Sequence, residues 1–464
     1  MSETQSSNPP AFTSNGGAHS LAEPAAEEHL PSYQVSQTAS PISTTVAHAN
    51  LNALSTGHQS TLADSSGKNK WLSLTVTTRP RKPQSLPQYW EGDIIKGQVE
   101  LDLREGKTEN AKRLSISVIG GTTLVGQPES IFLNDAQTLW TPSPTSPKLQ
   151  GKQTWPFEIT LPKQVDVKGS KYNLPPTFTV RGSPMHVDYK LVVQVKRGFF
   201  KSNAELMTTF GYLVSTVAEP PSTLRQTAYR EGSAVLGPEV DPEGWKILEP
   251  VKTTGSLFGQ SGTVEIEVTL AISKPLTYAL GSPVPLRLTL KSTNTTALDL
   301  LATPKSIRLE IVRSMITGPD AASNDTASLK SENVASENEG FAFWWDTPRT
   351  TDSGPPRDPN ERVLWGELEI PLTLKPTFSF HQFSLRYSLI LQPLTATGWH
   401  TASYSKQKKL KPLLSEWVTI VSKPTPGMPK ARSDAPPGYD RTQQTNFLKS
   451  VGVRGGSGFC VASR

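Results

Sequence analysis

Cysteine is almost absent from this sequence. The single cysteine, Cys460, excludes an internal disulfide framework. It is the fifth residue from the end, whereas a prenylation box needs its cysteine in the fourth position from the end. We therefore expect neither disulfide staples nor a prenyl anchor.

Long apolar segments are also lacking. No run of about 18 apolar residues occurs, which argues against a membrane-spanning helix. The first residues have no basic region followed by an apolar core, so they do not resemble a secretory signal. We expect a cytoplasmic protein, in which the Asn-X-Thr sequons at Asn294 and Asn324 are chance matches.

Motifs that carry catalysis or bind metals are missing as well. Four of the seven histidines lie within the first 68 residues, and none of the other three has a second histidine at metal-ligand spacing. The sequence contains no HExxH, CxxC or GxxxxGK motif. We therefore expect a non-enzymatic protein without cofactor or metal. The Lys-rich stretch 406–411 is too short to indicate nucleic-acid binding, because a solvated strand connection explains it equally well.

Charge is distributed unevenly along the chain. Residues 1–67 contain five carboxylates and no Lys or Arg, and since the whole chain has a formal net charge of +6, the remainder carries +11. Such a basic body favours acidic partners such as an anionic membrane surface or phosphorylated peptides, although solubility alone explains the same charge. Residues 1–68 are rich in Ser, Thr, Ala, Pro and Asn, and their composition predicts a disordered tail.

From Trp71 onward the hydrophobic pattern has a period of two. Apolar and polar residues alternate in segments such as 95–103, 155–161, 187–196, 264–272 and 383–391. This alternation is typical of antiparallel strands with one buried and one wet face, and we find no amphipathic helix of ten or more residues. The pattern predicts an all-β fold of two tandem, immunoglobulin-like β-sandwiches at 71–215 and 257–425.

The segments between and after the predicted sandwiches are rich in Pro, Gly and polar residues. Residues 216–256 are predicted to be a linker, and residues 426–464 a disordered C-terminal tail. A polar insertion at about 317–361 interrupts the second sandwich and contains the aromatic run FAFWW at 341–345. This run is predicted to form a strand or to pack a loop, and an exposed binding patch is the alternative.

The two predicted sandwiches share landmarks in the same order, which indicates a duplication. The four landmark pairs are Tyr89-Trp-Glu-Gly with Tyr278-Ala-Leu-Gly, RLSISVIG with SIRLEIVRS, Trp155-Pro-Phe-Glu-Ile with Trp365-Gly-Glu-Leu-Glu-Ile, and Tyr189-Lys-Leu with Tyr387-Ser-Leu.

The succession of these segments resembles the arrestin family. The pattern that starts at Tyr89, the segment RLSISVIGG at 113–121, WPFEITLP at 155–162, LPPTF at 174–178 and VDYKLVVQVKR at 187–197 follow the order of the arrestin N-terminal domain. The second predicted sandwich is similar to the arrestin C-terminal domain, more weakly. The resemblance covers about residues 71–425 and implies two tandem arrestin-like β-sandwiches with tails. No polar-core cluster of the visual arrestins can be matched.

A P-P-x-Y motif lies in the predicted C-terminal tail, at Pro436, Pro437 and Tyr439. In arrestin-related trafficking adaptors such motifs bind the WW domains of HECT-type ubiquitin ligases, while the body engages membrane transporters or receptors. Two prolines favour the polyproline II conformation that WW domains recognise. Leu30, Pro31 and Tyr33 form an L-P-x-Y variant that is a candidate second WW ligand.

The resemblance therefore implies an adaptor that recruits a HECT-type ligase to membrane cargo for ubiquitination and endocytosis, and that moves from the cytoplasm to the plasma membrane or endosomes. The alternative is a scaffold of the retromer-coat or pH-signalling kind that acts without ligase recruitment. In the segment TPSPTSPK, Thr141, Ser143 and Ser146 each precede a proline and are candidate phosphosites in an exposed loop. An ordinary Pro-rich loop is the alternative there.

Overall fold

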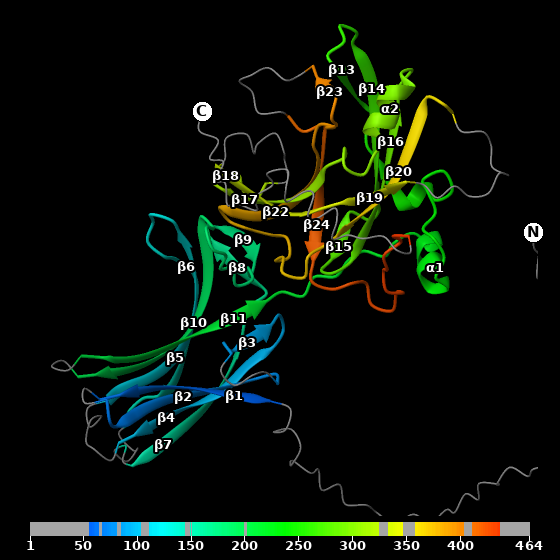
Figure 1. Ribbon diagram of the computed structural model, residues 1–464. Helices are drawn as coiled ribbons and strands as arrows, with labels where there is room; N and C mark the ends of the chain where they lie inside the picture. The colour runs from blue at the N-terminus through cyan, green and yellow to red at the C-terminus, as the bar shows by residue number, and fades with distance from the viewer. Residues whose placement is uncertain are drawn as a thin grey trace, which may run out of the picture. The chain divides into compact units, whose positions relative to one another are not determined.

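The computed structural model describes residues 55–64, 67–80, 85–103, 111–143, 149, 151–198, 202–323, 333–346, 358–402 and 411–436. Over these residues the chain is all-β with β-sandwich character, as predicted, and contains only two short α-helices (Figure 1). These are α1 (Thr223–Glu231) and α2 (Thr295–Leu301), with a single 3₁₀ turn at Pro242–Gly244. Both helices are shorter than ten residues, in agreement with the prediction that the sequence contains no amphipathic helix of that length. In the described part of the chain no helix is long and apolar enough to cross a membrane.

The N-terminal half of the described chain forms two sheets. The four-stranded sheet has the order β1-β2-β4-β7, with β1 (Thr56–Ala63), β2 (Lys70–Thr78), β4 (Ile94–Asp102) and β7 (Lys152–Thr160). The five-stranded sheet has the order β3-β11-β10-β5-β6, with β3 (Gln88–Trp90), β11 (Ala204–Leu213), β10 (Met185–Arg197), β5 (Ala111–Leu124) and β6 (Ser130–Trp140). A small hairpin of β8 (Gln164–Val167) and β9 (Ser170–Asn173) lies beside them. We call these elements the first sheet pair.

The C-terminal half forms a second sheet pair. One sheet has the order β19-β20-β16-β14-β13-β23, with β19 (Phe343–Asp346), β20 (Glu361–Glu369), β16 (Pro283–Lys291), β14 (Val264–Ser273), β13 (Val251–Leu257) and β23 (Trp399–Thr401), and β12 (Trp245–Ile247) also pairs with β14. The other has the order β15-β24-β22-β17-β18, with β15 (Thr277–Ala279), β24 (Leu414–Val421), β22 (Phe383–Leu391), β17 (Leu309–Thr317) and β18 (Asn333–Phe341), and β21 (Phe378–Phe380) pairs with β22.

The strand order of the first sheet pair recurs in the second. The run β1-β2-β4-β7 corresponds to β13-β14-β16-β20, and β3-β11-β10-β5-β6 corresponds to β15-β24-β22-β17-β18. In both pairs the short strand, β3 or β15, joins its sheet by a parallel pairing, with β11 or β24 respectively. All four sequence landmarks fall on corresponding strands. The repeated order supports the duplication that the sequence indicated.

A fifth landmark, which the sequence analysis missed, is the match between Leu174-Pro-Pro-Thr-Phe and Leu374-Lys-Pro-Thr-Phe. Tyr189 donates its buried hydroxyl to the Pro175 carbonyl at 2.6 Å, and Tyr387 donates to the Lys375 carbonyl at 2.8 Å. The two threonines of the motif also make matching contacts. The Thr177 hydroxyl accepts from the Tyr212 backbone N–H at 2.7 Å, and the Thr377 hydroxyl accepts from the Ile420 N–H at 2.9 Å. The two repeats therefore share side-chain contacts as well as strand order.

The alternating residues of the strands supply the core. On β4, for example, Ile95, Val99 and Leu101 are fully buried, which typically stabilises a protein by about 1.5–3 kcal/mol per side chain. Gly97 occupies the same face because a Cβ there would lie 2.2 Å from the Thr75 carbonyl oxygen and 2.8 Å from the Phe157 ring. The close approach of β2 and β7 thus requires a residue without a side chain.

Several elements lie where the sequence indicated loops, linker or tail. Strand β1 falls within the stretch 1–68, β12 and most of β13 fall within 216–256, and β18 falls within 317–361. Strand β19 contains residues 343–345 of the aromatic run, for which a strand was one of the predictions. Their backbone groups pair with neighbouring strands. The aromatic run contributes Trp344 and Trp345 to β19, where both side chains are buried, so the alternative of an exposed patch is wrong for these two residues.

Candidate functional site

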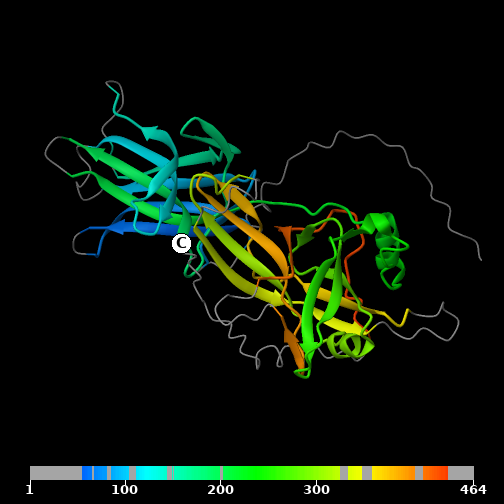
Figure 2. The same ribbon diagram turned by 90° about the horizontal axis from the view of Figure 1, so that it is seen from above.

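The chain beyond β24 continues as an extended segment along the second sheet pair. We call residues Ser422–Pro436, the last that the structure describes, the strap. In Figures 1 and 2 this orange-to-red segment runs beside α1. The sequence analysis assigned most of it to a disordered tail, because its Pro-rich composition offers little apolar area to bury. Its order comes from hydrogen bonds with distant parts of the chain.

The base of the strap is held by a reciprocal contact with the segment that follows β11. Ser422 donates its backbone N–H to the Thr216 hydroxyl at 3.0 Å, and Thr216 donates its own N–H to the Ser422 hydroxyl at 2.9 Å. One residue later, a parallel bridge pairs Val217 with Lys423. The Thr425 hydroxyl then donates to the Ala218 carbonyl at 2.8 Å. The strap therefore begins as a continuation of the sheet hydrogen bonding.

The middle of the strap covers a small cavity next to α1. This cavity, about 90 Å³ in volume, is lined by Arg225 and Tyr229 of α1, by Tyr278 of β15, and by Met428 and Pro429 of the strap, among others. Gly427 has φ = 74°, a left-handed conformation that favours glycine, in a turn where the Met428 N–H donates to the Thr425 carbonyl. The polar contacts of the strap with other segments lie at its two ends, at residues 422–425 and at Arg432 and Asp434.

The outer end of the strap is tied to the loop after α1 and to β20. The carboxylate of Asp434 accepts from the Val235 backbone N–H at 3.1 Å, and the Asp434 N–H donates to Glu367 Oε2 at 3.0 Å. Arg432 donates from Nη2 to the Ser233 carbonyl at 2.7 Å. These three contacts form what we call the Asp434 clamp.

Local sequence sets the two ends of α1, and Arg225 fixes the helix on the second sheet pair. Ser222 caps the helix by accepting from the Arg225 N–H at 3.3 Å, and Gly232 ends it in the left-handed conformation with φ = 80°. The guanidinium of Arg225, which is only 3% exposed, donates to the carbonyls of Lys274 and Gly244, both at 2.6 Å. It also lies 5.1 Å from the centre of the Trp245 ring. Arg225 thereby fixes the helix to β12 and β14.

The electrostatics of the clamp reflect its partial burial. Desolvation raises the pKa of the Asp434 carboxyl above its ordinary value, and Glu367 adds to this effect, while the Val235 N–H and Arg432 oppose it. Burial likewise raises the pKa of Tyr229 to about 12, with Glu367 and Asp434 contributing in the same direction. Protonation of the Asp434 carboxyl therefore favours the docked form of the strap.

The residues expected to bind WW domains are placed only in part. Pro436 is the last described residue and is half-buried, whereas Pro437 and Tyr439 lie outside the described residues. Leu30, Pro31 and Tyr33 also lie outside them. Among the candidate phosphosites, Thr141 and Ser143 are exposed directly after β6, and Ser146 is outside the described residues. Because most of these residues lie outside the described part of the chain, the structure does not relate the three groups to one another. It adds Asp434, which the sequence analysis did not single out.

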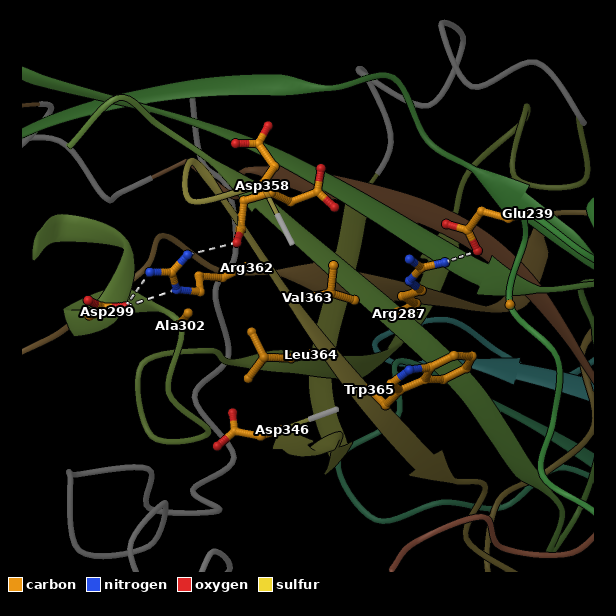
Figure 3. A pocket seen from close by; sticks show the side chains of 12 residues that line it. Glu239, Arg287, Asp299, Ala302, Asp346, Asp358, Arg362, Val363, Leu364 and Trp365 are labelled. Carbon is orange, nitrogen blue, oxygen red and sulfur yellow. Dashed lines mark hydrogen bonds and ion pairs between the residues drawn. The ribbon is translucent and has the colours of Figure 1, made fainter. Parts of the chain in front are cut away.

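A larger hollow, of about 800 Å³, opens on β16 and β20 (Figure 3). Arg287 pairs with Glu239 and lies 5.8 Å from the centre of the Trp365 ring, and Arg362 pairs with Asp299 at 2.8 Å. Its other ionisable side chains are carboxylates: Asp346, Asp358 and Glu361. Among the described lining residues no Ser, Cys, His or Lys is available as a nucleophile or base. In the described part of the chain, no group of three or more His, Cys, Asp or Glu side chains could hold a metal ion.

Comparisons with known proteins do not assign the chain to a family. No family model matches it, and the search of curated proteins found no match.

Proposed function

We propose that this protein is a non-enzymatic adaptor of the arrestin-related kind, which links membrane transporters or receptors to a WW-domain ubiquitin ligase of the HECT type. The proposal rests on the family resemblance of the sequence, and the repeated strand order of the two sheet pairs is compatible with two tandem arrestin-like sandwiches. In this function the protein works in the cytoplasm and moves to the plasma membrane or endosomes with its cargo. Contact of the basic body with anionic lipid would assist that recruitment.

The observation that carries the proposal is the position of Pro436 at the outer end of the strap. The base of the strap is hydrogen bonded to Thr216 and Ala218, through Ser422 and Thr425, so the chain is anchored to the folded body shortly before this proline. A ligase that binds the P-P-x-Y motif is then tethered close to the folded body, and to any cargo on it. Such tethering raises the effective concentration of the ligase at the cargo without a new contact.

The proposal is tested by titrating a purified WW domain of a HECT-type ligase against the full chain and its Tyr439→Ala variant. A short peptide makes few contacts, so loss of the aromatic anchor should weaken binding by about 2 kcal/mol, a factor of roughly 30. Tyr439→Phe, which keeps the ring, is the matched control, and Tyr33→Ala measures the contribution of the L-P-x-Y segment. Both should retain most of the affinity.

Equal affinity of the wild-type chain and Tyr439→Ala would contradict ligase recruitment through this motif. The rival function, a scaffold of the retromer-coat or pH-signalling kind, would then remain, because it uses the same architecture without a ligase. An unchanged thermal midpoint of Tyr439→Ala should accompany the loss of binding, since the composition of residues 426–464 predicts a disordered tail.

A further inference from the structure

The strap holds the first residue of the P-P-x-Y motif against the protein. Asp434 is two residues before Pro436, and both its carboxylate and its backbone N–H are engaged, by Val235 and Glu367 respectively. Glu367 is a buried residue of the sheet, with only 3% exposure, so it is a rigid attachment point. Asp434, Ala435 and Pro436 are all half-buried.

A WW domain must close around a motif whose first residue is half-buried in the docked strap. Polyproline II has three residues per turn, so residues three apart share one face. In the bound form of P-P-x-Y, Pro436 and Tyr439 are three apart and lie on the same face. The aromatic groove of a WW domain must take up this face. Because Pro436 is half-buried in the docked strap, only part of its surface is open to that groove.

We infer that the Asp434 clamp is an autoinhibitory contact: it must open before a WW domain can close around the motif. The inference rests on the proposed function and adds its regulation. When the binding-competent form is only a fraction of the population, the apparent affinity falls by that fraction. The clamp thus lets an event at the second sheet pair control recruitment of the ligase.

Opening the clamp should therefore strengthen binding. Removal of one hydrogen bond of ordinary strength shifts such an equilibrium by about 3- to 10-fold. Asp434→Ala in the full chain should then bind the WW domain about 3- to 10-fold more tightly than the wild type. Arg432→Ala, which removes the contact with the Ser233 carbonyl, should act in the same direction and add to Asp434→Ala. Asp434→Asn is the matched control, because its amide oxygen can still accept from the Val235 N–H and it carries no charge to desolvate; it should bind the WW domain no more tightly than the wild type.

The experiment compares these full-length variants with a synthetic peptide of residues 431–445, in one titration series with the same WW domain. The peptide has no clamp, so it should bind more tightly than the wild-type chain and at least as tightly as Asp434→Ala, which keeps the Arg432 and Glu367 contacts. Amide hydrogen exchange provides a second measurement, since both the Val235 and the Asp434 N–H are hydrogen bonded in the docked strap. Exchange at both amides should rise when the WW domain is added.

The outcomes separate the two proposals. If neither the peptide nor any full-length variant binds, the proposed function fails and the inference falls with it. If the peptide and the wild-type chain bind equally and Asp434→Ala changes nothing, the inference alone is overturned and the proposed function stands. Unchanged exchange at Val235 and Asp434 in the bound chain would likewise overturn the inference, because it would show that the motif binds with the clamp closed.

Discussion

Arg225 offers a sharp test of how α1 and the strap are held on the second sheet pair. We consider its replacement by Met, which keeps most of the side-chain length but removes the guanidinium. Arg225 spans from α1 to the carbonyls of Lys274 and Gly244 and stacks on Trp245. Its buried position means that no water can replace these contacts readily.

The expected loss of stability follows from the two carbonyls, of Lys274 and Gly244, that lose their donor. Two hydrogen bonds from a charged donor are worth about 1.5–3 kcal/mol each. The Gly244 carbonyl keeps a second donor, the Lys274 N–H at 2.7 Å, so its loss is smaller. The Nε atom of Arg225 is buried without a hydrogen-bond partner among the described residues, which already offsets part of the gain. We therefore expect Arg225→Met to lower the free energy of unfolding by about 3 kcal/mol, at the low end of the sum of both bonds.

Chemical and thermal denaturation, followed by tryptophan fluorescence, measure this loss. In a domain of about 150–250 residues, a loss of about 3 kcal/mol in the free energy of unfolding lowers the thermal midpoint by about 6–12 °C. Arg230→Met is the matched control, because Arg230 lies exposed in the last turn of the same helix and should cost only a few tenths of a kcal/mol. Arg225→Lys should lie in between, since an ammonium group cannot span two carbonyls as a guanidinium does. A loss below about 1 kcal/mol for Arg225→Met, or an equal loss for Arg230→Met, would refute this reasoning.

Three further predictions concern the strap, the loop after β6 and the repeated motif. Burial raises the pKa of Asp434 in the docked strap above its value in the released strap, so docking is favoured at low pH and weakens as pH rises through the raised pKa. The peptide should therefore bind the WW domain more tightly than the full chain does by a factor that grows from pH 7 toward about pH 4. This growth should vanish in Asp434→Asn, which has no carboxyl group to titrate. Phosphorylation after β6 would add negative charge to a basic body, so Ser143→Ala/Ser146→Ala should change membrane recruitment and cargo turnover across growth conditions, and no change in either would rule out control at this loop. Tyr189→Phe and Tyr387→Phe each leave a motif carbonyl without its hydroxyl donor and should each cost about 1–3 kcal/mol in chemical denaturation; a cost for one alone would contradict their equivalence.

Much of the fold was predictable from the sequence because a strand with one buried face has apolar residues at every second position. The alternation at 95–103 and 383–391 falls on β4 and β22, and the four landmark pairs fall on corresponding strands of the two sheet pairs. The P-P-x-Y motif is also a property of the sequence alone, since a linear ligand needs only its own residues. The expectation of a non-enzymatic protein without cofactor or metal also rests on the sequence alone, and it stays a prediction.

The tertiary structure decided the features that depend on contacts between distant residues. Strand β1 has no clear alternation, and it is a strand because its backbone pairs with β2. The match between LPPTF and LKPTF becomes meaningful only when Tyr189 and Tyr387 are seen to donate to equivalent carbonyls. The strap has the composition of a disordered tail, yet Asp434 meets Val235, some 199 residues away in the chain, and Glu367, 67 residues away. Local composition reports how much apolar surface a segment can bury by itself, whereas the order of the strap comes from hydrogen-bond partners that only the folded second sheet pair supplies.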